Sequence, residues 1–590
     1  MAATPDRQPQ DDYDVAILGG GLAGLSLGLQ LKRARPDLQV FVGEKRKGPA
    51  PEAAFKVGES SLEIGAHYFA RVLGLKDHIE SDQLPKMGVR FFYPAGDNSD
   101  IAQRCEYGPP FRPQLPTYQF DRGRLENELA RRSLEVGVDL FDGCTVEEVE
   151  LSPDGHKVRF ARDGASSTLT ARWVVDAAGR ASFLKRRLGL EKEAPHDINS
   201  SWFRLSERLD LEDWTDDESF HARMGERGLR WLSTNHLLDK GYWVWLIPLS
   251  SGSTSIGIVA DPRIHPAEEI DTLDDAFEWL REHEPQLAGV LDERRDKVVD
   301  FLRVHHYSHG AERVYSPDRW CLTGDAGVFL DPLFSPGSDF IGTSNSLITS
   351  LILADLAGEP VADKVELVND YYLRYFDAWL SHYRDLYPLF DNVLLTTVRF
   401  GWYALVYFGI FVPLFYENRT ADLDFLAEVQ DELDRVLELI PRVAGLVNDW
   451  GKLENPKVPT LHVRPITPDK GGLHDEFLST SQSESTPRLG ADEVKAHIVK
   501  NRRMLEAAAV VYFDEAVGQL PGESLEPGAR INPYAISLDP ERWDEDGVFD
   551  ETGMTVAEAD AATAGLRDVL DALRFGRVPS GPPPRPVPST

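Results

Sequence analysis

The sequence predicts an α/β fold with a Rossmann-like domain, an inserted antiparallel sheet and a helical C-terminal part. Near the N-terminus, the apolar run "DVAIL" (residues 14–18) is followed by a glycine turn, by apolar residues at helical spacing that stop at Pro36, and by a second apolar run, "LQVFVGE". This order is typical of a β-α-β unit, which pairs its strands in parallel through a right-handed crossover. Residues 195–305 are rich in Trp and in alternating patterns, and residues 356–450 carry helical, aromatic patterns.

The length of the chain requires more than one domain. Its 590 residues exceed the roughly 250–300 residues that a single hydrophobic core supports. We expect a nucleotide-binding domain over residues 11–355, with the inserted sheet at about 195–305 on its substrate side. A helical, aromatic-rich region over 356–450 is expected to cap the substrate. Residues 451–590 predict a linker, further helices and a disordered, proline-rich tail.

Composition excludes several classes of partner. The formal net charge of −34 repels phosphate backbones, so we expect no nucleic-acid partner. Three cysteines, Cys105, Cys144 and Cys321, are too few for a disulfide framework, and the polar N-terminus lacks an apolar signal segment, so we expect a cytoplasmic protein. The apolar run Val393–Tyr416 approaches the length of a membrane span, but Arg399 interrupts it. This favours a buried helix over a membrane-contacting one.

The glycine turn predicts a dinucleotide site. Gly19, Gly21 and Gly24 fit the G-x-G-x-x-G pattern between a strand and a helix. The first glycine allows a tight turn, the second lets backbone approach a pyrophosphate, and the third lets helix and strand pack closely. Glu44 ends the second predicted strand, where a carboxylate can accept hydrogen bonds from ribose hydroxyls.

Two later stretches favour FAD over NAD. "VVDAAGR" (Val174–Arg180) and "LTGDAGVFLDP" (Leu322–Pro332) each end a predicted strand in small residues with an Asp. In the second stretch, Asp325 can reach the ribitol hydroxyls of a flavin. With the first glycine motif, these stretches resemble the FAD-dependent monooxygenases related to para-hydroxybenzoate hydroxylase.

Three further stretches resemble the flavin-dependent halogenases. "KVGES" (Lys56–Ser60) is similar to their "GES" stretch beside the flavin, and "WVWLIP" (Trp243–Pro248) matches their W-x-W-x-I-P signature. "LPKMGVRFF" (Leu84–Phe92) resembles the K-x-G-x-x-F element of members that act on phenols or carrier-bound rings.

The resemblance implies a set of site residues. Lys86 takes the place of the catalytic lysine, Trp243 and Trp245 would keep substrate away from the flavin, and Glu59 is a candidate charge partner of the lysine. The resemblance adds further expected FAD-binding residues: Gly58, Arg124, Asp176, Gly179, Asp325, Gly327 and Pro332.

The resemblance also implies chemistry and partners. Reduced FAD, supplied by a separate flavin reductase, would react with oxygen and a chloride or bromide co-substrate, and Lys86 would then deliver the oxidised halogen to an electron-rich ring. A lysine suits this step because a desolvated amine can donate a hydrogen bond or, with a lowered pKa, form a haloamine. The substrate would be a small phenolic, pyrrolic or carrier-tethered aromatic of secondary metabolism. A homodimer is left open.

The loop "DPLFSPGSDF" (Asp331–Phe340) departs from the family pattern. Its backbone amides are associated with the halide in the family, yet Pro336 stands where Thr or Ser is usual and has no N–H to give. Halide binding would then fall to Gly337, helped by Ser338. Phe334 stands where tryptophan-acting members generally carry a glutamate, which argues against free tryptophan as substrate.

Other functions stay open. A monooxygenase of the same fold would oxygenate its substrate without halide, and a prenyl-lipid reductase would share the "GES" stretch. A catalytically silent flavoprotein that binds a partner through residues 451–590 is a further alternative. We expect no metal, because the alternation in "HHYSH" predicts a strand that would separate His305 from His309.

Overall fold

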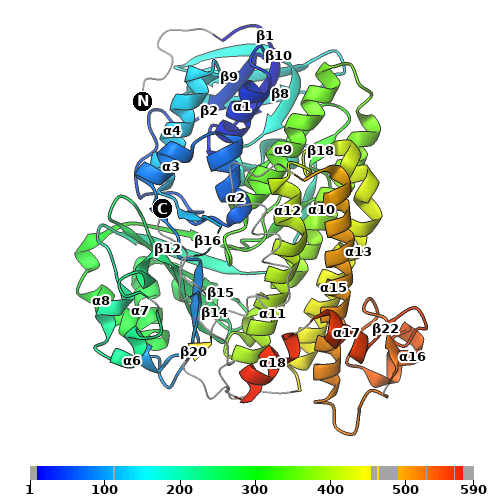
Figure 1. Cartoon of the computed structure of the whole chain (residues 1–590). Coiled ribbons are helices and arrows are strands. Elements are labelled where there is room, and N and C mark those ends of the chain that lie inside the picture. The colour runs from blue at the N-terminus through cyan, green and yellow to red at the C-terminus, as the bar shows by residue number, and fades with distance from the viewer. Residues whose placement is uncertain are drawn as a thin grey trace.

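The computed structural model describes residues 9–109, 113, 115–224, 226–453, 462–463, 489–526, 528–563 and 565–575. Most of the predicted linker and the proline-rich tail lie outside these residues. In the described part, a nucleotide-binding domain and a second sheet lie one above the other, and a layer of long helices runs along both (Figure 1). The predicted fold class is confirmed.

The first sheet is the Rossmann-like part. Its strand order is β18-β19-β10-β1-β2-β7, and β1 pairs in parallel with both β2 and β10. Helix α1 (Leu22–Ala34) connects β1 to β2, as the β-α-β pattern predicts. The strands of this sheet, with two antiparallel additions, are β1 (Asp12–Leu18), β2 (Val40–Glu44), β7 (Asp139–Asp142), β8 (Cys144–Glu150), β9 (His156–Arg162), β10 (Ala165–Asp176), β18 (Tyr315–Ser316) and β19 (Trp320–Leu322).

The second sheet is built mainly from the inserted segment. Its strand order is β16-β12-β15-β14-β13-β4-β5-β20, and the first five strands pair antiparallel. The short strand β4 comes from earlier in the chain and adds in parallel to β13, so the sheet is mixed at this edge. Its strands are β4 (Val89–Phe92), β5 (Glu106–Tyr107), β12 (Asn199–Leu205), β13 (Thr234–Asp239), β14 (Tyr242–Pro248), β15 (Thr254–Ala260), β16 (Val298–Val304) and β20 (His462–Val463).

Long helices form the third layer. Helix α10 packs against α13, and α13 packs against α15, so residues far apart in sequence lie side by side (Figure 1). The helices of this layer and the C-terminal part are α9 (Gly337–Leu356), α10 (Ala362–Tyr383), α11 (Val393–Val406), α12 (Val412–Tyr416), α13 (Leu423–Trp450), α15 (Ala491–Val517), α17 (Val556–Ala562) and α18 (Leu566–Phe575).

The apolar segment Val393–Tyr416 is a helix of the core. In the described residues it is the one helix long and apolar enough to cross a membrane, and 78% of its most apolar window is buried inside the protein. Arg399 on this helix is fully buried and donates to the carbonyls of His382 and Ala444, at 2.6 Å each. The His382 carbonyl lies in the last turn of α10, where the helix dipole favours a cation, and the Ala444 carbonyl lies within α13. The charge therefore ties three helices together.

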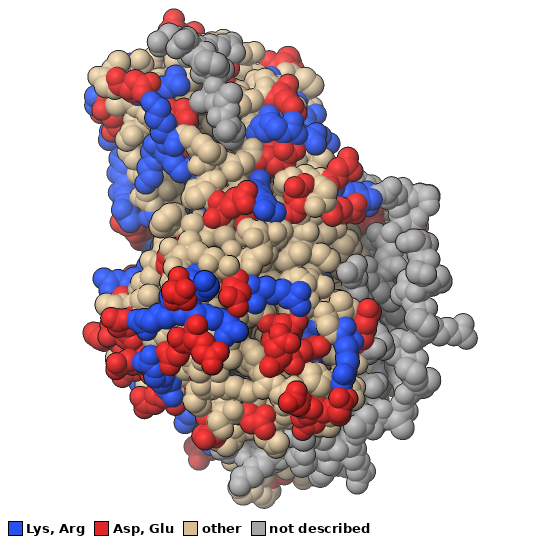
Figure 2. Space-filling view, turned by 90° about the vertical axis from the view of Figure 1, so that its left-hand side faces the viewer, with Lys and Arg blue, Asp and Glu red and all other residues tan. Residues whose placement is uncertain are grey.

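The surface carries charges of both signs. Figure 2 shows acidic and basic side chains interleaved over one face, without a large area of one sign. Arg281 and Asp292, 2.7 Å apart, form one of the exposed ion pairs.

Candidate active site

The glycine turn between β1 and α1 has the geometry of a nucleotide cradle. Gly19 has φ +119°, and a Cβ there would come within 2.4 Å of the Ala177 carbonyl oxygen. A Cβ on Gly24 would lie 2.0 Å from the carbonyl oxygen of Gly19, so only glycine allows α1 to start this close to the strand. At Gly21 a Cβ would meet no protein atom within 4 Å. The turn is therefore closed on the protein side and open where a pyrophosphate would approach.

Glu44 is held in place beside this turn. Its Oε2 accepts from the Gly20 N–H and its Oε1 accepts from the Arg46 N–H, both at 2.8 Å. Each carboxylate oxygen has a second lone pair, so the group can still accept from ribose hydroxyls.

The two aspartates expected near the flavin have different surroundings. Asp176 is buried and accepts from the Ala178 and Leu184 N–H groups, at 2.9 and 2.7 Å, which stabilises its own turn. Burial raises the pKa of Asp176 to about 6. Asp325 makes no side-chain hydrogen bond among the described residues, and although burial raises its pKa, the charges of Arg180 and Arg122 oppose this rise. Asp325 is therefore the freer acceptor for a ligand hydroxyl.

Two partly exposed arginines add positive charge that the sequence patterns did not reveal. The Nε atoms of Arg46 and Arg122 are buried and have no hydrogen-bond partner in the described part of the chain. Both arginines lie near the carboxylate of Glu126, which is paired with Arg122 at 2.7 Å. Donors left unpaired inside a protein are uncommon, and next to the open glycine turn they fit a phosphate-containing group such as FAD.

The other residues expected to bind FAD are Gly58, Arg124, Gly179, Gly327 and Pro332. Gly58 has φ +84°, and a Cβ there would lie 2.9 Å from Arg122 Nη1. Gly179 also has a positive φ and faces open space, whereas Gly327 packs against Leu322 and Val314. Arg124 is instead turned toward Glu52 and Ser250, at 3.1 and 3.3 Å, so it needs no ligand to satisfy it. Pro332 belongs to the loop described below.

Lys86 is buried in the short segment that connects β3 (Leu84–Pro85) to β4. Its Nζ donates to the Ser61 carbonyl at 2.8 Å. Burial lowers the pKa of Lys86, while the carboxyls of Glu63 and Asp339 oppose this shift. The neutral amine is thus more accessible here than on a solvated lysine.

The expected pairing of Glu59 with Lys86 is wrong. Glu59 accepts from Arg204 Nε at 2.8 Å, and Arg204 Nη1 donates to Asp300 Oδ2 at 2.7 Å, all of them buried. Strand β12 of the second sheet supplies this arginine, and no sequence pattern indicated that it would come so close. Glu59 therefore ties the segment before α2 to the second sheet.

The carboxyls that act on Lys86 are Glu63 and Asp339. Glu63 begins α2 (Glu63–His67), four residues after Glu59, and Asp339 lies in the first turn of α9. Burial raises the pKa of each to about 7. The "SD" after Gly337 was the only sequence sign of Asp339.

Trp243 and Trp245 share one face of β14, which is buried on both faces, and their ring centroids are 5.6 Å apart. Trp245 Nε1 donates to Ser255 Oγ at 3.1 Å. Gly257 stands opposite it on β15, where a Cβ would lie 2.1 Å from the indole. The strand therefore leaves room for a large ring.

Trp243 reaches the loop before α9. Its Nε1 donates to the Tyr387 hydroxyl, which donates to Asp331 Oδ2, at 2.8 Å each. His196 Nε2 lies 2.6 Å from the same oxygen. A buried chain of hydrogen bonds thus fixes the start of the loop.

The loop itself has an unusual backbone. Phe334 and Ser335 both have φ +67°, a conformation that side chains rarely adopt. Asp331 helps to hold it, since its Oδ1 accepts from the Leu333 N–H at 2.7 Å. The Phe334 ring stacks on Tyr403 with centroids 4.5 Å apart.

Pro336 ends the loop as the N-cap of α9. Its carbonyl accepts from the Asp339 and Phe340 N–H groups, at 3.0 Å each. The N–H groups of Gly337 and Ser338 have no acceptor among the described residues. The proline therefore starts a helix whose first two amides are free, rather than removing the anion-binding end.

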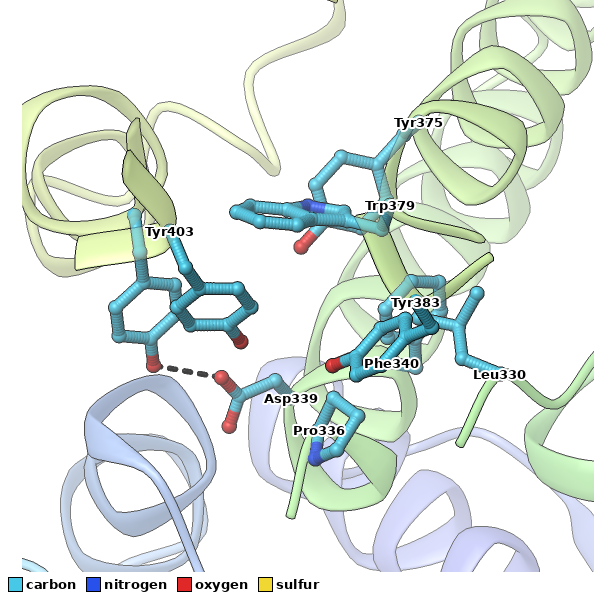
Figure 3. A pocket seen from close by; sticks show the side chains of 9 residues that line it. Leu330, Pro336, Asp339, Phe340, Tyr375, Trp379, Tyr383 and Tyr403 are labelled. Carbon is cyan, nitrogen blue, oxygen red and sulfur yellow. Dashed lines mark hydrogen bonds between the residues drawn. The ribbon is translucent and has the colours of Figure 1, made fainter. Parts of the chain in front are cut away.

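A narrow aromatic pocket adjoins this helix end (Figure 3). Its side chains leave about 200 Å³ between them, with almost no space wide enough for a water molecule. Its walls are Leu330, Pro336, Asp339, Phe340, Tyr375, Trp379, Tyr383, Tyr403 and Tyr407.

The predicted strand through "HHYSH" is wrong. Strand β16 ends at Val304, His306 turns the chain with φ +49°, and β17 (His309–Ala311) starts at His309. His309 Nδ1 lies 3.0 Å from Lys185 Nζ. In the residues that the structure describes, no three His, Cys, Asp or Glu side chains gather as a metal site.

The open glycine turn, Glu44 and Asp325 on a parallel sheet define a flavin-nucleotide-binding protein. A sequence profile of the FAD binding domain family matches residues 12–337, and the chain belongs to this family.

Relatives and solved structures agree with this assignment. The chain is 26% identical over 443 residues to flavin-dependent halogenase chlA of Dictyostelium discoideum, covering 68% of this chain and 70% of that one. It is 28% identical over 433 residues to the 1H-pyrrole-2-carbonyl peptidyl-carrier-protein brominase of Pseudoalteromonas luteoviolacea, covering 72% and 91%. The crystal structure of halogenase PltM with phloroglucinol and FAD has a TM-score of 0.58 and 20% identity, and covers 84% of this chain and 96% of that one. The resemblance to flavin-dependent halogenases is confirmed.

Proposed function

We propose that this protein is an FAD-dependent halogenase that uses reduced FAD, oxygen and a halide to halogenate an electron-rich aromatic substrate. The observation that carries the proposal is Lys86, a buried amine whose charge is destabilised and whose Nζ hydrogen-bonds to a single backbone carbonyl. A lysine kept only for solubility would lie in water.

The cofactor site would use the residues of the glycine turn. The Gly19–Gly21 turn and the α1 N-terminus would bind the pyrophosphate, Glu44 the ribose and Asp325 the ribityl chain. When bound and reduced, FAD would supply the electrons that reduce oxygen to the peroxide level, at which it can oxidise the halide. Gly58, Gly179, Gly327 and Pro332 would line the same site, and Arg124 would support it from outside.

Lys86 would handle the oxidised halogen. As a neutral amine, its lone pair can attack the halogen of hypohalous acid, forming an N–halogen bond and releasing water. As an ammonium, it can instead donate a hydrogen bond to the same molecule. Trp243 and Trp245 would exclude substrate from the flavin side, because their rings cover one face of β14.

The halide would bind at the free end of α9. The amides of Gly337 and Ser338 and the positive end of the helix dipole suit a desolvated anion. The N–H of Ser338, the residue after Gly337, then takes the place of the N–H that Pro336 lacks.

The substrate would be a phenol, a pyrrole or a carrier-tethered ring. Relatives that act on pyrrole-2-carbonyl carrier proteins support the third option. A separate flavin reductase, a cytoplasmic location and a homodimer complete the proposal. The separate reductase follows because the sequence has no second dinucleotide motif with which the chain could bind NADH.

Product mass with and without halide tests the proposal. The purified chain is supplied with FAD, a flavin reductase, NADH and phloroglucinol or pyrrole-2-carboxylate, in buffer that contains bromide, chloride or neither. We expect products with the isotope pattern of the added halide. Equal yields of a product that gains only oxygen, whatever the salt, would contradict it.

A monooxygenase is the second candidate. Pro336 favours it, since the loop position nearest the start of α9 supplies no N–H to an anion. In this case the mass gain would be that of oxygen, and bromide would leave the yield unchanged.

A further inference from the structure

Asp339 places a carboxyl group among aromatic side chains. It is 1% exposed and lines the aromatic pocket beside Pro336. Its Oδ1 accepts from the Gly65 N–H at 2.8 Å, and its Oδ2 accepts from the Tyr407 hydroxyl at 2.6 Å. Because a carboxylate oxygen can accept two hydrogen bonds, each oxygen retains one unused position.

The opposite wall of the pocket holds an unused donor. Trp379 is 2% exposed, and its Nε1 has no hydrogen-bond partner among the described residues. Figure 3 shows Trp379 and Asp339 on two sides of the same space, with Tyr403 and Tyr383 beside them. A buried N–H without a partner costs free energy, so it suggests a group that arrives from outside.

Apolar and polar walls together define a ligand class. The rings of Phe340, Tyr375 and Trp379 offer flat surfaces, which suit another aromatic ring. Asp339 offers the acceptor. The unfilled space of about 200 Å³ is almost nowhere wide enough for a water molecule, so the side chains must move apart to admit a ring.

We propose that Asp339 is a specificity-determining residue that accepts the ring O–H or N–H of an aromatic substrate in this pocket. The inference rests on the proposed function for its substrate class. Asp339 selects substrates with a free hydroxyl or pyrrole N–H on the ring and disfavours their O-methyl or N-methyl forms. A buried acceptor left without its partner makes the methylated ring bind less well.

A purely structural role for Asp339 has different consequences. An acidic residue in the first turn stabilises a helix. The bonds to Gly65 and Tyr407 also join α9 to α2 and to the helical turn that follows α11, Tyr407–Phe411. That role predicts lower stability on substitution, but no preference between hydroxylated and methylated rings.

Binding to the oxidised, FAD-loaded enzyme tests the inference without halide or reductant. Resorcinol and 1,3-dimethoxybenzene form one probe pair, and pyrrole and N-methylpyrrole form a second, each titrated by ligand-observed NMR. We expect the wild type to bind the hydrogen-bond donor of each pair about tenfold more tightly. Asp339→Asn should reduce the preference to less than about threefold, whereas Tyr407→Phe, which keeps the carboxylate, should retain it.

The wild-type comparison does not require any variant to fold. No preference in the wild type, no binding of either pair, or an unchanged preference in Asp339→Asn would each overturn the inference. The binding test does not depend on halogenation. If the wild type prefers the hydrogen-bond donors but gives no halogenated product, only the proposed function is contradicted.

Discussion

The indole N–H of Trp243 donates to the hydroxyl of Tyr387 at 2.8 Å, and through Tyr387 it reaches Asp331 in the loop before α9. A tryptophan of the second sheet thus helps to set the position of the proposed halide site. This link gives Trp243 a role that its ring alone would not have.

Tyr387→Phe breaks both bonds of this link and leaves the ring in place. We expect a cost of about 1–3 kcal/mol and, because the loop loosens, an increase in the KM for bromide with unchanged FAD content. Initial rates over a bromide series measure this. Tyr371→Phe is the control, since Tyr371 is also buried but its hydroxyl makes no hydrogen bond to a described residue. Equal KM changes in the two variants would contradict the link.

Gly21→Ala tests the nucleotide cradle. The added methyl group meets no protein atom within 4 Å, so the unfolding transition of the FAD-free chain should not move. FAD affinity should fall at least about tenfold if a pyrophosphate lies against this backbone. Fluorescence titration with FAD measures the change, and Gly289→Ala, equally free of neighbours, should bind FAD like the wild type. Normal FAD affinity in Gly21→Ala would refute the cradle.

Asp339 makes stability depend on pH. Its pKa is raised from 3.8 to about 7 by burial, so its contribution to the free energy of unfolding is complete below pH 3.8 and is lost as pH rises through 7. Between pH 4 and 8 the wild type should lose up to about 4 kcal/mol relative to Asp339→Asn, at about 1.36 kcal/mol per pKa unit. Urea unfolding of both proteins at pH 4 and pH 8 measures this difference, and parallel pH dependences would contradict it.

Glu63→Gln should shift the pH dependence of activity. Glu63 raises the pKa of Lys86 against the effect of burial, so its removal lowers that pKa further. If the neutral amine is the active form, the acid limb of the kcat/KM profile moves to lower pH. Glu59→Gln is the matched control: its partner is Arg204, so it should lower stability without moving the limb. If the acid limb moved in Glu59→Gln instead, Glu59 would be the charge partner of Lys86.

The sequence predicted the parts of the fold that depend on local patterns. Gly19, Gly21 and Gly24 between two apolar runs were sufficient to predict the β-α-β unit, because the spacing of the glycines and the apolar periodicity are both local patterns. The core helix over Val393–Tyr416 was also predicted, since a charge inside an apolar run favours burial with partners.

Contacts between distant segments could not be predicted in this way. Glu59 meets Arg204, 145 residues away, and Asp339 meets Gly65, 274 residues away. No periodicity carries such information, so the partners of Lys86 were misassigned. The missing N–H of Pro336 was plain from the sequence, but its position as the N-cap of α9, with the Gly337 and Ser338 amides following it, could be described only from the backbone.

Lys86→Met is the most direct test of the account, because methionine keeps much of the buried volume and removes the amine. The variant and the wild type are supplied with reduced FAD, oxygen, bromide and phloroglucinol, and products are resolved by mass spectrometry while FAD content and oxygen consumption are recorded. We expect both proteins to bind FAD and consume oxygen, and only the wild type to give brominated product. Brominated product in equal yield from Lys86→Met would contradict the central role of Lys86.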